Sequence, residues 1–256
     1  MVADSTVFVT GASQGLGREI AVAFADAGAN VVLAARSDGI HETADAIDAP
    51  ERTLAVETDV TDTESVADAI DETVETFGGL DCLVNNAGIA GPTAPIEETT
   101  DGEWLETLDV NVVGIARVTR AAAPHLRESE RGSVVNISSI GGKRPYANRT
   151  PYAASKMGVI GLTRALAAEF GDDGVTVNAI CPGPVEGDRI RGVFERQAEE
   201  ADVPVEAVED EVLESLMIDD LVPPEEVAEV AVHLASSASQ HVTGQDINVS
   251  SGGAWY

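Results

Sequence analysis

The chain has 256 residues, of which 45 are acidic and 15 are lysine or arginine, so its formal net charge is −30 at pH 7. Such a surface repels the phosphates of nucleic acids and of anionic membranes, so we expect neither as a partner. The chain has no stretch of about 18 apolar residues, so we predict neither a membrane span nor a signal peptide, and we expect a cytoplasmic protein.

Length and patterning favour a single domain that covers residues 1–256. A chain of this size buries one sizeable core, and neither a flexible linker nor a low-complexity tract divides it. The acidic residues run through the whole chain, which is typical of proteins from salt-accumulating halophiles, particularly haloarchaea. We therefore expect the fold to weaken in low-salt buffer, where the acidic charges repel one another without screening.

Cysteines and histidines predict neither a disulfide framework nor a metal site. Cys82 and Cys181 lie in or just after apolar runs, where buried, reduced thiols are expected. The four histidines are scattered without a spacing suited to ligation, so we predict no bound metal.

A glycine-rich turn separates the first predicted strand, residues 5–10, from the first predicted helix, which ends near Ala27. Such a turn lets the backbone approach a pyrophosphate and directs the helix N–H groups toward it. A purely structural turn is the alternative. The candidate cofactor-binding residues of this turn are Gly11, Ser13, Gln14, Gly15, Leu16 and Gly17.

The end of the second predicted strand, residues 30–35, bears on the choice of cofactor. An acidic side chain here would bind the 2′-hydroxyl of the adenosine ribose, whereas a nearby arginine would receive a 2′-phosphate. The chain has Ala35 followed by Arg36, so NADP(H) is favoured and NAD(H) remains possible. A surface arginine beside either cofactor is the alternative, because Gln14 leaves the glycine-rich turn without a second basic residue.

The third predicted strand, residues 54–58, is followed by Asp59 and Val60. Asp59 either faces a ligand or caps the helix predicted at residues 64–77. Asp62 offers a second cap for the same helix.

Two further segments depart from simple local patterns. The fourth predicted strand, residues 80–84, runs into Asn-Asn-Ala-Gly at residues 85–88, which by itself would pass for an ordinary turn. A long helix is predicted at residues 103–123, but the β-branched residues around Asn111 are poor helix formers. A local rule broken inside an element indicates a functional site.

The stretch from Ser139 to Lys156 carries the strongest candidate for proton transfer. Ser139 follows a predicted strand, residues 134–137, and so lies at the sheet edge where parallel α/β proteins bind ligands. Thr150 is expected to cap the helix that follows. Tyr152 and Lys156 then share one helix face, where the ammonium favours the phenolate and lowers the pKa of the phenol. A solvated pair on a helix surface is the alternative.

The last third of the chain is predicted to enclose the substrate. A sixth strand, residues 175–180, leads into Pro-Gly-Pro-Val at residues 182–185. The acidic, helical segment 186–222 is predicted to be a substrate-binding lid, with a solvated helical hairpin as the alternative. Arg189 or Arg191 at its start would suit a carboxylate-bearing substrate. Another helix and a final strand complete an alternation that predicts a sheet covered by helices on both faces.

These motifs, in this order and over essentially the whole chain, resemble the short-chain dehydrogenase/reductase family. The spacing of Ser139, Tyr152 and Lys156 is similar to its Ser and Tyr-x-x-x-Lys signature, and Thr10 precedes a turn similar to its Thr-Gly-x3-Gly-x-Gly element. The resemblance implies a Rossmann-type, doubly wound parallel sheet of seven strands in one domain. It also implies an NAD(P)-dependent oxidoreductase acting on carbonyl or hydroxyl groups, similar to 3-oxoacyl-(acyl carrier protein) reductases.

The resemblance implies four catalytic side chains. Tyr152 would exchange a proton with the substrate oxygen, Ser139 would orient that oxygen, and Lys156 would lower the pKa of Tyr152 and hold the cofactor ribose. Asn111 would distort its helix and free a backbone carbonyl to hold a water against Lys156. Gly187 stands where many members have a threonine, so that cofactor contact is lacking. The other implied cofactor contacts are Arg36, Asp59, Val60, Asn86, Ala87, Gly88, Pro182, Gly183 and Val185.

The resemblance also implies a small-molecule carbonyl or alcohol substrate and a homotetramer or homodimer. The interface would join the helices that carry Asn111 and the Tyr152–Lys156 pair. Two other functions remain open: an NAD-dependent sugar or sugar-acid dehydrogenase, and a catalytically silent dinucleotide-sensing protein on the same fold. The silent protein would not need the set of Asn, Ser, Tyr and Lys that this chain carries complete.

Overall fold

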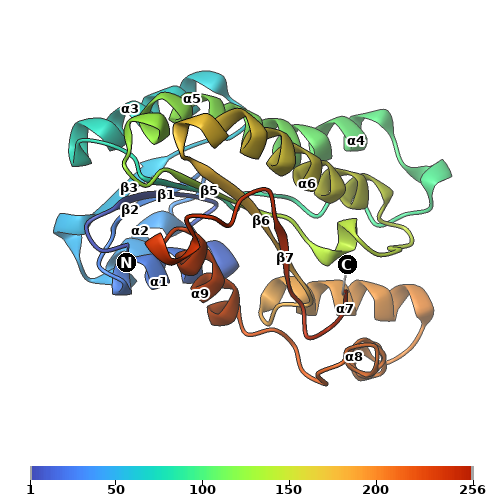
Figure 1. The fold of residues 1–256 in the computed structure, drawn as a ribbon. Helices are drawn as coiled ribbons and strands as arrows, with labels where there is room; N and C mark the ends of the chain where they lie inside the picture. Colours follow the sequence, from blue (N-terminus) through green and yellow to red (C-terminus); the bar gives the residue numbers. More distant parts are fainter. Residues whose placement is uncertain (1, 255–256) are drawn as a thin grey trace.

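The computed structural model of the chain describes residues 2–254, with only the backbone of Glu200; residues 1 and 255–256 of the predicted domain lie outside it. Seven strands form one sheet in the order β3-β2-β1-β4-β5-β6-β7, and every pair is parallel (Figure 1). The predicted doubly wound Rossmann-type sheet is thus confirmed. The strands are β1 (Thr6–Thr10), β2 (Asn30–Ala35), β3 (Thr53–Glu57), β4 (Cys82–Asn85), β5 (Ser133–Ile137), β6 (Thr176–Pro182) and β7 (Asp246–Val249).

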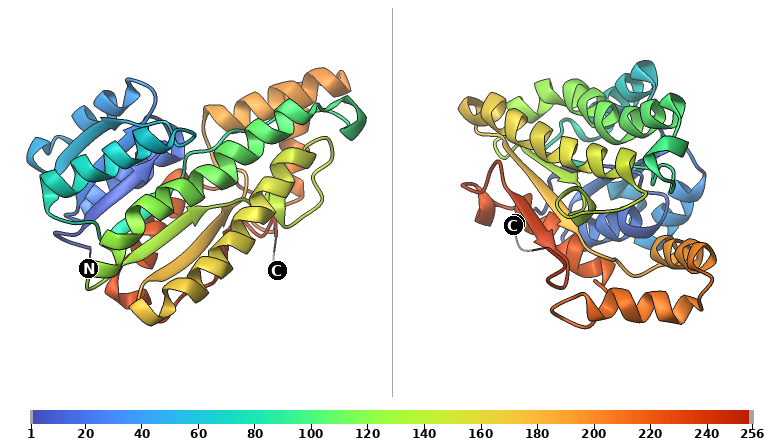
Figure 2. Two further views of the ribbon diagram at one scale, coloured as in Figure 1. Left: turned by 90° about the horizontal axis from the view of Figure 1, so that it is seen from above. Right: turned by 90° about the vertical axis from the view of Figure 1, so that its right-hand side faces the viewer.

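Helices cover both faces of the sheet, as the first two figures show from three directions (Figures 1 and 2). One face carries α1 (Gly15–Asp26), α2 (Gly39–Ile47) and α9 (Pro224–Leu234). The other face carries α3 (Thr63–Phe77), α5 (Gly114–Glu128) and α6 (Thr150–Phe170). The remaining helices are α4 (Asp101–Leu108), α7 (Asp188–Ala201) and α8 (Val205–Glu214). Within residues 2–254, no helix is long and apolar enough to cross a membrane.

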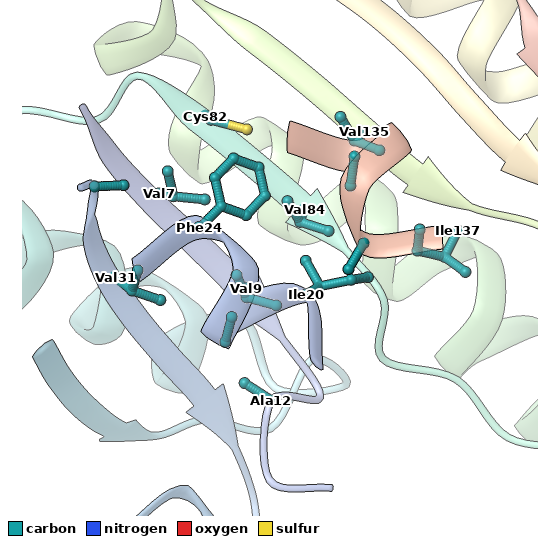
Figure 3. Close-up of a cluster of buried hydrophobic side chains, with 14 of the residues drawn as sticks. Val7, Val9, Ala12, Ile20, Phe24, Val31, Cys82, Val84, Val135 and Ile137 are labelled. Carbon is teal, nitrogen blue, oxygen red and sulfur yellow. The ribbon is translucent and has the colours of Figure 1, made fainter. Parts of the chain in front are cut away.

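The apolar core lies between the sheet and these two helical layers. Figure 3 shows Ile20 and Phe24 of α1 packed over β-branched side chains such as Val7 and Val84. Because both faces of each inner strand are covered, strands such as β1 and β5 are buried at every residue and consist mainly of apolar side chains. Cys82 and Cys181 are buried free thiols, as predicted, and burial raises the pKa of Cys82 to about 12.

Two elements differ from the prediction made from the sequence. The helix expected at residues 103–123 is broken into α4, a π-helical turn at Asp109–Val113, and α5. The β-branched patch around Asn111 thus forms a widened turn in place of regular helix. Helix α2 was not predicted at all.

Candidate active site

A cleft of about 1130 Å³ opens at the carboxyl ends of the strands, where the strand order reverses between β1 and β4. Crevices at this switch point bind ligands in open α/β sheets. The loops that follow β1 to β6 all contribute to its wall. The predicted site residues among its lining are Gly11, Ser13, Gln14, Gly15, Leu16, Gly17, Arg36, Asp59, Val60, Asn86, Ala87, Gly88, Ser139, Tyr152, Lys156, Pro182, Gly183 and Val185.

The glycine-rich turn packs directly against the Asn-Asn-Ala-Gly segment after β4. The side-chain amide of Asn86 donates to the carbonyls of Thr10 and Gly11 at 3.0 and 3.1 Å, and the Thr10 hydroxyl accepts from the N–H of Asn86 at 2.9 Å. A Cβ at Gly17 would collide with the Gly11 carbonyl and the Asn86 amide. Glycine at residue 17 therefore allows the turn, the start of α1 and the loop after β4 to pack closely together, and these three segments form the floor of the cleft.

The amino end of α1 faces this floor without a cap of its own. Its N-cap residue, Gln14, makes no side-chain capping hydrogen bond, and the first turn holds no acidic residue. The first N–H groups of a helix have no partner inside the helix, and its dipole favours an anion there. The turn and the helix end thus fit a dinucleotide pyrophosphate.

Asn85, which precedes the floor of the cleft, links two neighbouring strands. The amide of Asn85 donates to Asn136 Oδ1 at 2.9 Å, which joins the ends of β4 and β5. Asn136 in turn donates to the hydroxyl of Thr163 on α6 at 2.9 Å. This buried relay holds the helix that carries Tyr152 against the sheet.

Arg36 and Asp59 meet at the far end of the cleft, although they follow different strands. The guanidinium of Arg36 is 3.8 Å from Asp59 Oδ2, and its side chain is 65 % exposed. Asp59 Oδ1 accepts from the N–H and hydroxyl of Thr61 at 2.9 and 2.7 Å. Burial opposes ionisation of Asp59, but these hydrogen bonds and the Arg36 charge hold its pKa below the usual range. Asp62, not Asp59, caps α3, accepting from Glu64 N at 2.8 Å.

Tyr152, Lys156 and Ser139 converge on the opposite end of the cleft. The ammonium of Lys156 is buried, donates to the Ile137 carbonyl at 2.9 Å, and lies 5.8 Å from the centre of the Tyr152 ring. A Cβ placed on Gly141 would be 3.2 Å from the Tyr152 ring and 3.3 Å from Ser139 Oγ. The phenol and the hydroxyl therefore border the same small space.

The charges around Tyr152 favour its phenolate. Burial alone would raise the pKa of the phenol, but the charge of Lys156, followed by Arg189, the Ser139 hydroxyl and Arg149, lowers it below its ordinary value. The pKa of Lys156 is also lowered, chiefly by burial, while its attraction to Tyr152 opposes that change. A phenol with a depressed pKa can exchange a proton near neutral pH.

Asn111 lies behind the cleft and is fully buried in the π-helical turn. Its side chain accepts from Ile89 N at 2.8 Å and donates to the Ile89 carbonyl and the Ser155 hydroxyl, each at 3.0 Å. A Cβ on Gly88 would be 3.1 Å from Asn111 Oδ1 and 3.6 Å from Lys156 Nζ. Asn111 thus joins the β4 loop to α6 close to Lys156.

The sequence analysis missed two neighbours of Tyr152, one aromatic and one cationic. Tyr146 packs edge-on against Tyr152 with 6.3 Å between ring centres, and the guanidinium of Arg149 lies 5.4 and 5.2 Å from the two rings. Both residues lie between Ser139 and Tyr152 in the sequence, and this position was the signal that could have identified them as site residues. The prediction that Thr150 caps α6 is wrong: Arg149 holds the N-cap position, and Thr150 is the first helical residue.

The segment after β6 supplies the remaining wall. Helices α7 and α8 share a small apolar cluster around Phe194, Ala198 and Val208 that is separate from the main core. Arg189 lines the cleft, whereas Arg191 is not among its lining residues. Gly187, at the N-cap of α7, has φ +127°, a backbone conformation that few other residues adopt.

Within the described part of the chain, no cluster of three histidine, cysteine or acidic residues is arranged to hold a metal ion. The donor groups of the cleft are instead backbone N–H groups, hydroxyls and basic side chains, which suit an anionic dinucleotide.

Comparison with known proteins gives consistent matches over nearly the whole chain. Residues 11–253 match the family described as enoyl-(acyl carrier protein) reductase. A cis-4-hydroxycyclohexanecarboxylate dehydrogenase of Sinomonas cyclohexanicum is 38 % identical, with 98 % of this chain and 96 % of the relative covered. A putative ketoacyl reductase of Streptomyces coelicolor is 38 % identical, with 97 % of each chain covered. The solved actinorhodin polyketide ketoreductase with NADPH has a TM-score of 0.94 and 35 % identity, covering 99 % of this chain and 98 % of its own.

Proposed function

Because this chain belongs to the short-chain dehydrogenase/reductase family, we propose that it is a ketone reductase that prefers NADP(H) and uses Ser139, Tyr152 and Lys156 for catalysis. It is an NAD(P)-dependent oxidoreductase acting on carbonyl or hydroxyl groups. The convergence of these three side chains at one end of a dinucleotide-sized cleft carries the proposal. Its physiological substrate class within that activity is a 3-oxoacyl compound or related ketone.

The three side chains have distinct tasks. Ser139 donates to the substrate oxygen and orients it, because its Oγ borders the same space as the Tyr152 ring. Tyr152 gives a proton to that oxygen in reduction and takes one from it in oxidation, since its pKa is depressed. Lys156 maintains this depression from the buried position that its bond to Ile137 secures, and it binds the ribose. The bound nicotinamide supplies or accepts the hydride.

Asn111 is a positioning residue in this proposal. Its three hydrogen bonds to Ile89 and Ser155 hold the π-helical turn beside Lys156. The widened turn displaces backbone carbonyls from regular helical pairing, and one of them would hold a water that links Lys156 to solvent.

Arg36 is the residue on which the NADP(H) preference rests. Its guanidinium is exposed and only loosely paired with Asp59 at 3.8 Å, so a 2′-phosphate can replace that contact, and Ala35 offers no carboxylate to a free 2′-hydroxyl. Calorimetric titration of the protein with NADPH and then with NADH, in molar KCl, tests this cofactor preference. Arg36→Ala should weaken NADPH binding by about 10- to 100-fold and leave NADH unchanged. Tighter NADH binding by the unaltered protein would instead favour an NAD-linked dehydrogenase.

Residues 186–222 are proposed to form a lid over the substrate. The α7–α8 pair has its own apolar cluster, so it can move without opening the main core, and Ile190, Val193 and Phe194 line the cleft. Addition of NADPH should then slow hydrogen exchange in this segment more than in α3, none of whose residues lines the cleft.

A homodimer or homotetramer is proposed through the outer surface of α4, the π-helical turn and α6. Leu105, Val113 and Met157 on these elements are 68, 43 and 50 % exposed. Large apolar side chains on neighbouring elements are typical of an interaction face. Sedimentation in molar KCl should give an oligomer, and Met157→Glu should shift it toward the monomer.

The acidic residues that run through the chain lead us to propose that the protein works in the cytoplasm of a salt-accumulating halophile.

A further inference from the structure

Arginines gather at the substrate end of the cleft although acidic residues outnumber basic ones three to one, 45 against 15. Arg144, Arg149 and Arg189 all line this end of the cleft. Glu186 and Asp188 are the acidic residues of the same wall, and both are exposed, as is Arg189. Positive charge is thus concentrated where a substrate would bind, in a protein whose surface is otherwise strongly negative.

Among the side chains that the structure describes, these arginines have no carboxylate partner. Some arginines elsewhere hold acids closely; Arg127 and Arg164, for example, lie 2.7 and 2.8 Å from Asp173 and Asp246. Among the ion pairs of residues 2–254, none includes an arginine of the substrate end. The chain has many carboxylates, but none of those described pairs with these arginines, so their positive charge is available to a ligand.

Arg149 shows the most unusual environment of the three. Only 4 % of it is exposed, and it donates to two neutral oxygens, the Ala90 carbonyl at 2.8 Å and the Thr93 hydroxyl at 3.3 Å. Its buried Nε has no hydrogen-bond partner among the described residues. A buried cation is unfavourable unless an anion compensates it, and the rings of Tyr146 and Tyr152 compensate it only in part.

Arg189 approaches the same place from the lid. It stands in the first turn of α7, and its charge acts on both Tyr152 and Lys156. Arg149 and Arg189 therefore flank the phenol from two different elements. Ile190, Val193 and Phe194, which follow Arg189 on α7, also line the cleft and provide an apolar surface for the body of a substrate.

We propose that the substrate is a keto or hydroxy acid whose carboxylate is bound between Arg149, at the start of α6, and Arg189, at the start of α7. The carboxylate supplies the missing counter-charge, while the apolar body contacts the lid and the reacting oxygen meets Ser139 and Tyr152. This inference rests on the proposed oxidoreductase function and narrows its substrate class, from 3-oxoacyl compounds and related ketones to ketones or alcohols that carry a free carboxylate. Guanidinium groups suit this task because they bind carboxylates with two parallel hydrogen bonds.

The test uses linear, alicyclic and aromatic ketones, each supplied as a carboxylate and as its methyl ester. Wild-type enzyme with saturating NADPH should prefer the acid in at least one pair, with a KM about 10- to 100-fold lower than for the ester. Arg189→Ala should remove most of that preference, because it should raise the KM for the acid far more than the KM for the ester. Arg191→Ala is the matched control, since it removes the same charge from the same helix outside the cleft, and it should retain the preference. Arg149→Leu should act like Arg189→Ala if its melting temperature shows that it is folded.

Several results would overturn the inference. Equal use of acid and ester in every pair would do so, as would equal losses for acid and ester in Arg189→Ala. A loss of NADPH affinity in Arg189→Ala that matches its loss of acid binding would assign this arginine to the cofactor instead. If no ketone is reduced, the proposed function fails, and calorimetry of the same acids and esters on the enzyme with NADP⁺ decides the inference separately. Tighter acid binding that Arg189→Ala abolishes would support it, and equal or absent binding would contradict it.

Discussion

Replacement of Lys156 by methionine tests how the candidate proton donor is tuned. The ammonium lies 5.8 Å from the centre of the Tyr152 ring. If this distance is taken as the separation of the two charges, the ammonium stabilises the phenolate by about 3 kcal/mol at an effective dielectric constant of about 20, and screening at the half-buried phenol reduces this to about 2 kcal/mol. Methionine keeps the length and apolar stem of the side chain but removes the charge. The pKa of Tyr152 should therefore rise, since its depressed value depends first on Lys156 among the neighbouring charges.

The assay is alcohol oxidation with saturating NADP⁺ in molar KCl, measured across pH. Oxidation requires the phenolate, so activity rises with pH through the pKa of Tyr152. In Lys156→Met this rise should move to higher pH. The rate at neutral pH should fall about 30-fold, which corresponds to about 2 kcal/mol, and most of the loss should be recovered in alkaline buffer. Lys156→Arg retains the charge and should keep the rise closer to its original pH.

The shape of the pH–rate profile tests this prediction. A Lys156→Met enzyme that loses activity equally at every pH would refute the electrostatic argument, because the phenol would then titrate as before. Binding of NADPH, measured separately by calorimetry, distinguishes the ribose-binding role from the effect on Tyr152.

Three further outcomes follow from the packing and charge of the chain. Gly17→Ala should weaken binding of both NADPH and NADH at least 10-fold in a calorimetric titration, because the new Cβ would meet the Gly11 carbonyl; undiminished binding would show that the turn adjusts. Phe24→Ala should lower the free energy of unfolding by about 3–5 kcal/mol in guanidinium titrations, because the ring is fully buried, whereas Phe24→Leu should lose far less. Lastly, the thermal midpoint should rise steeply with KCl, since a net charge of −30 repels itself at low ionic strength; a midpoint that does not depend on salt would argue against the halophilic assignment.

The strands, the glycine-rich turn and helix α6, which carries Tyr152 and Lys156, could be predicted because each has a local cause. Covered parallel strands need continuous apolar runs, and a strand-to-helix turn beside a close-packed loop needs glycine, as Gly17 shows. The spacing of Tyr152 and Lys156 sets their common helix face. Even the widened turn at Asn111 was indicated locally, because β-branched residues and asparagine disfavour regular helix.

Contacts between segments far apart in the chain were decided by the tertiary structure alone. Arg36 and Asp59 follow neighbouring strands, so their pairing depends on strand order, and the choice of Asp62 as the cap of α3 depends on the path of the loop. Whether Arg189 or Arg191 faces the cleft depends on the rotation of α7 against the sheet. The burial of Arg149 between two tyrosine rings arises where the β4 loop meets the start of α6. Sequence patterns record the periodicity of one element, whereas the charge and shape of a binding site arise from loops that only the folded sheet brings together.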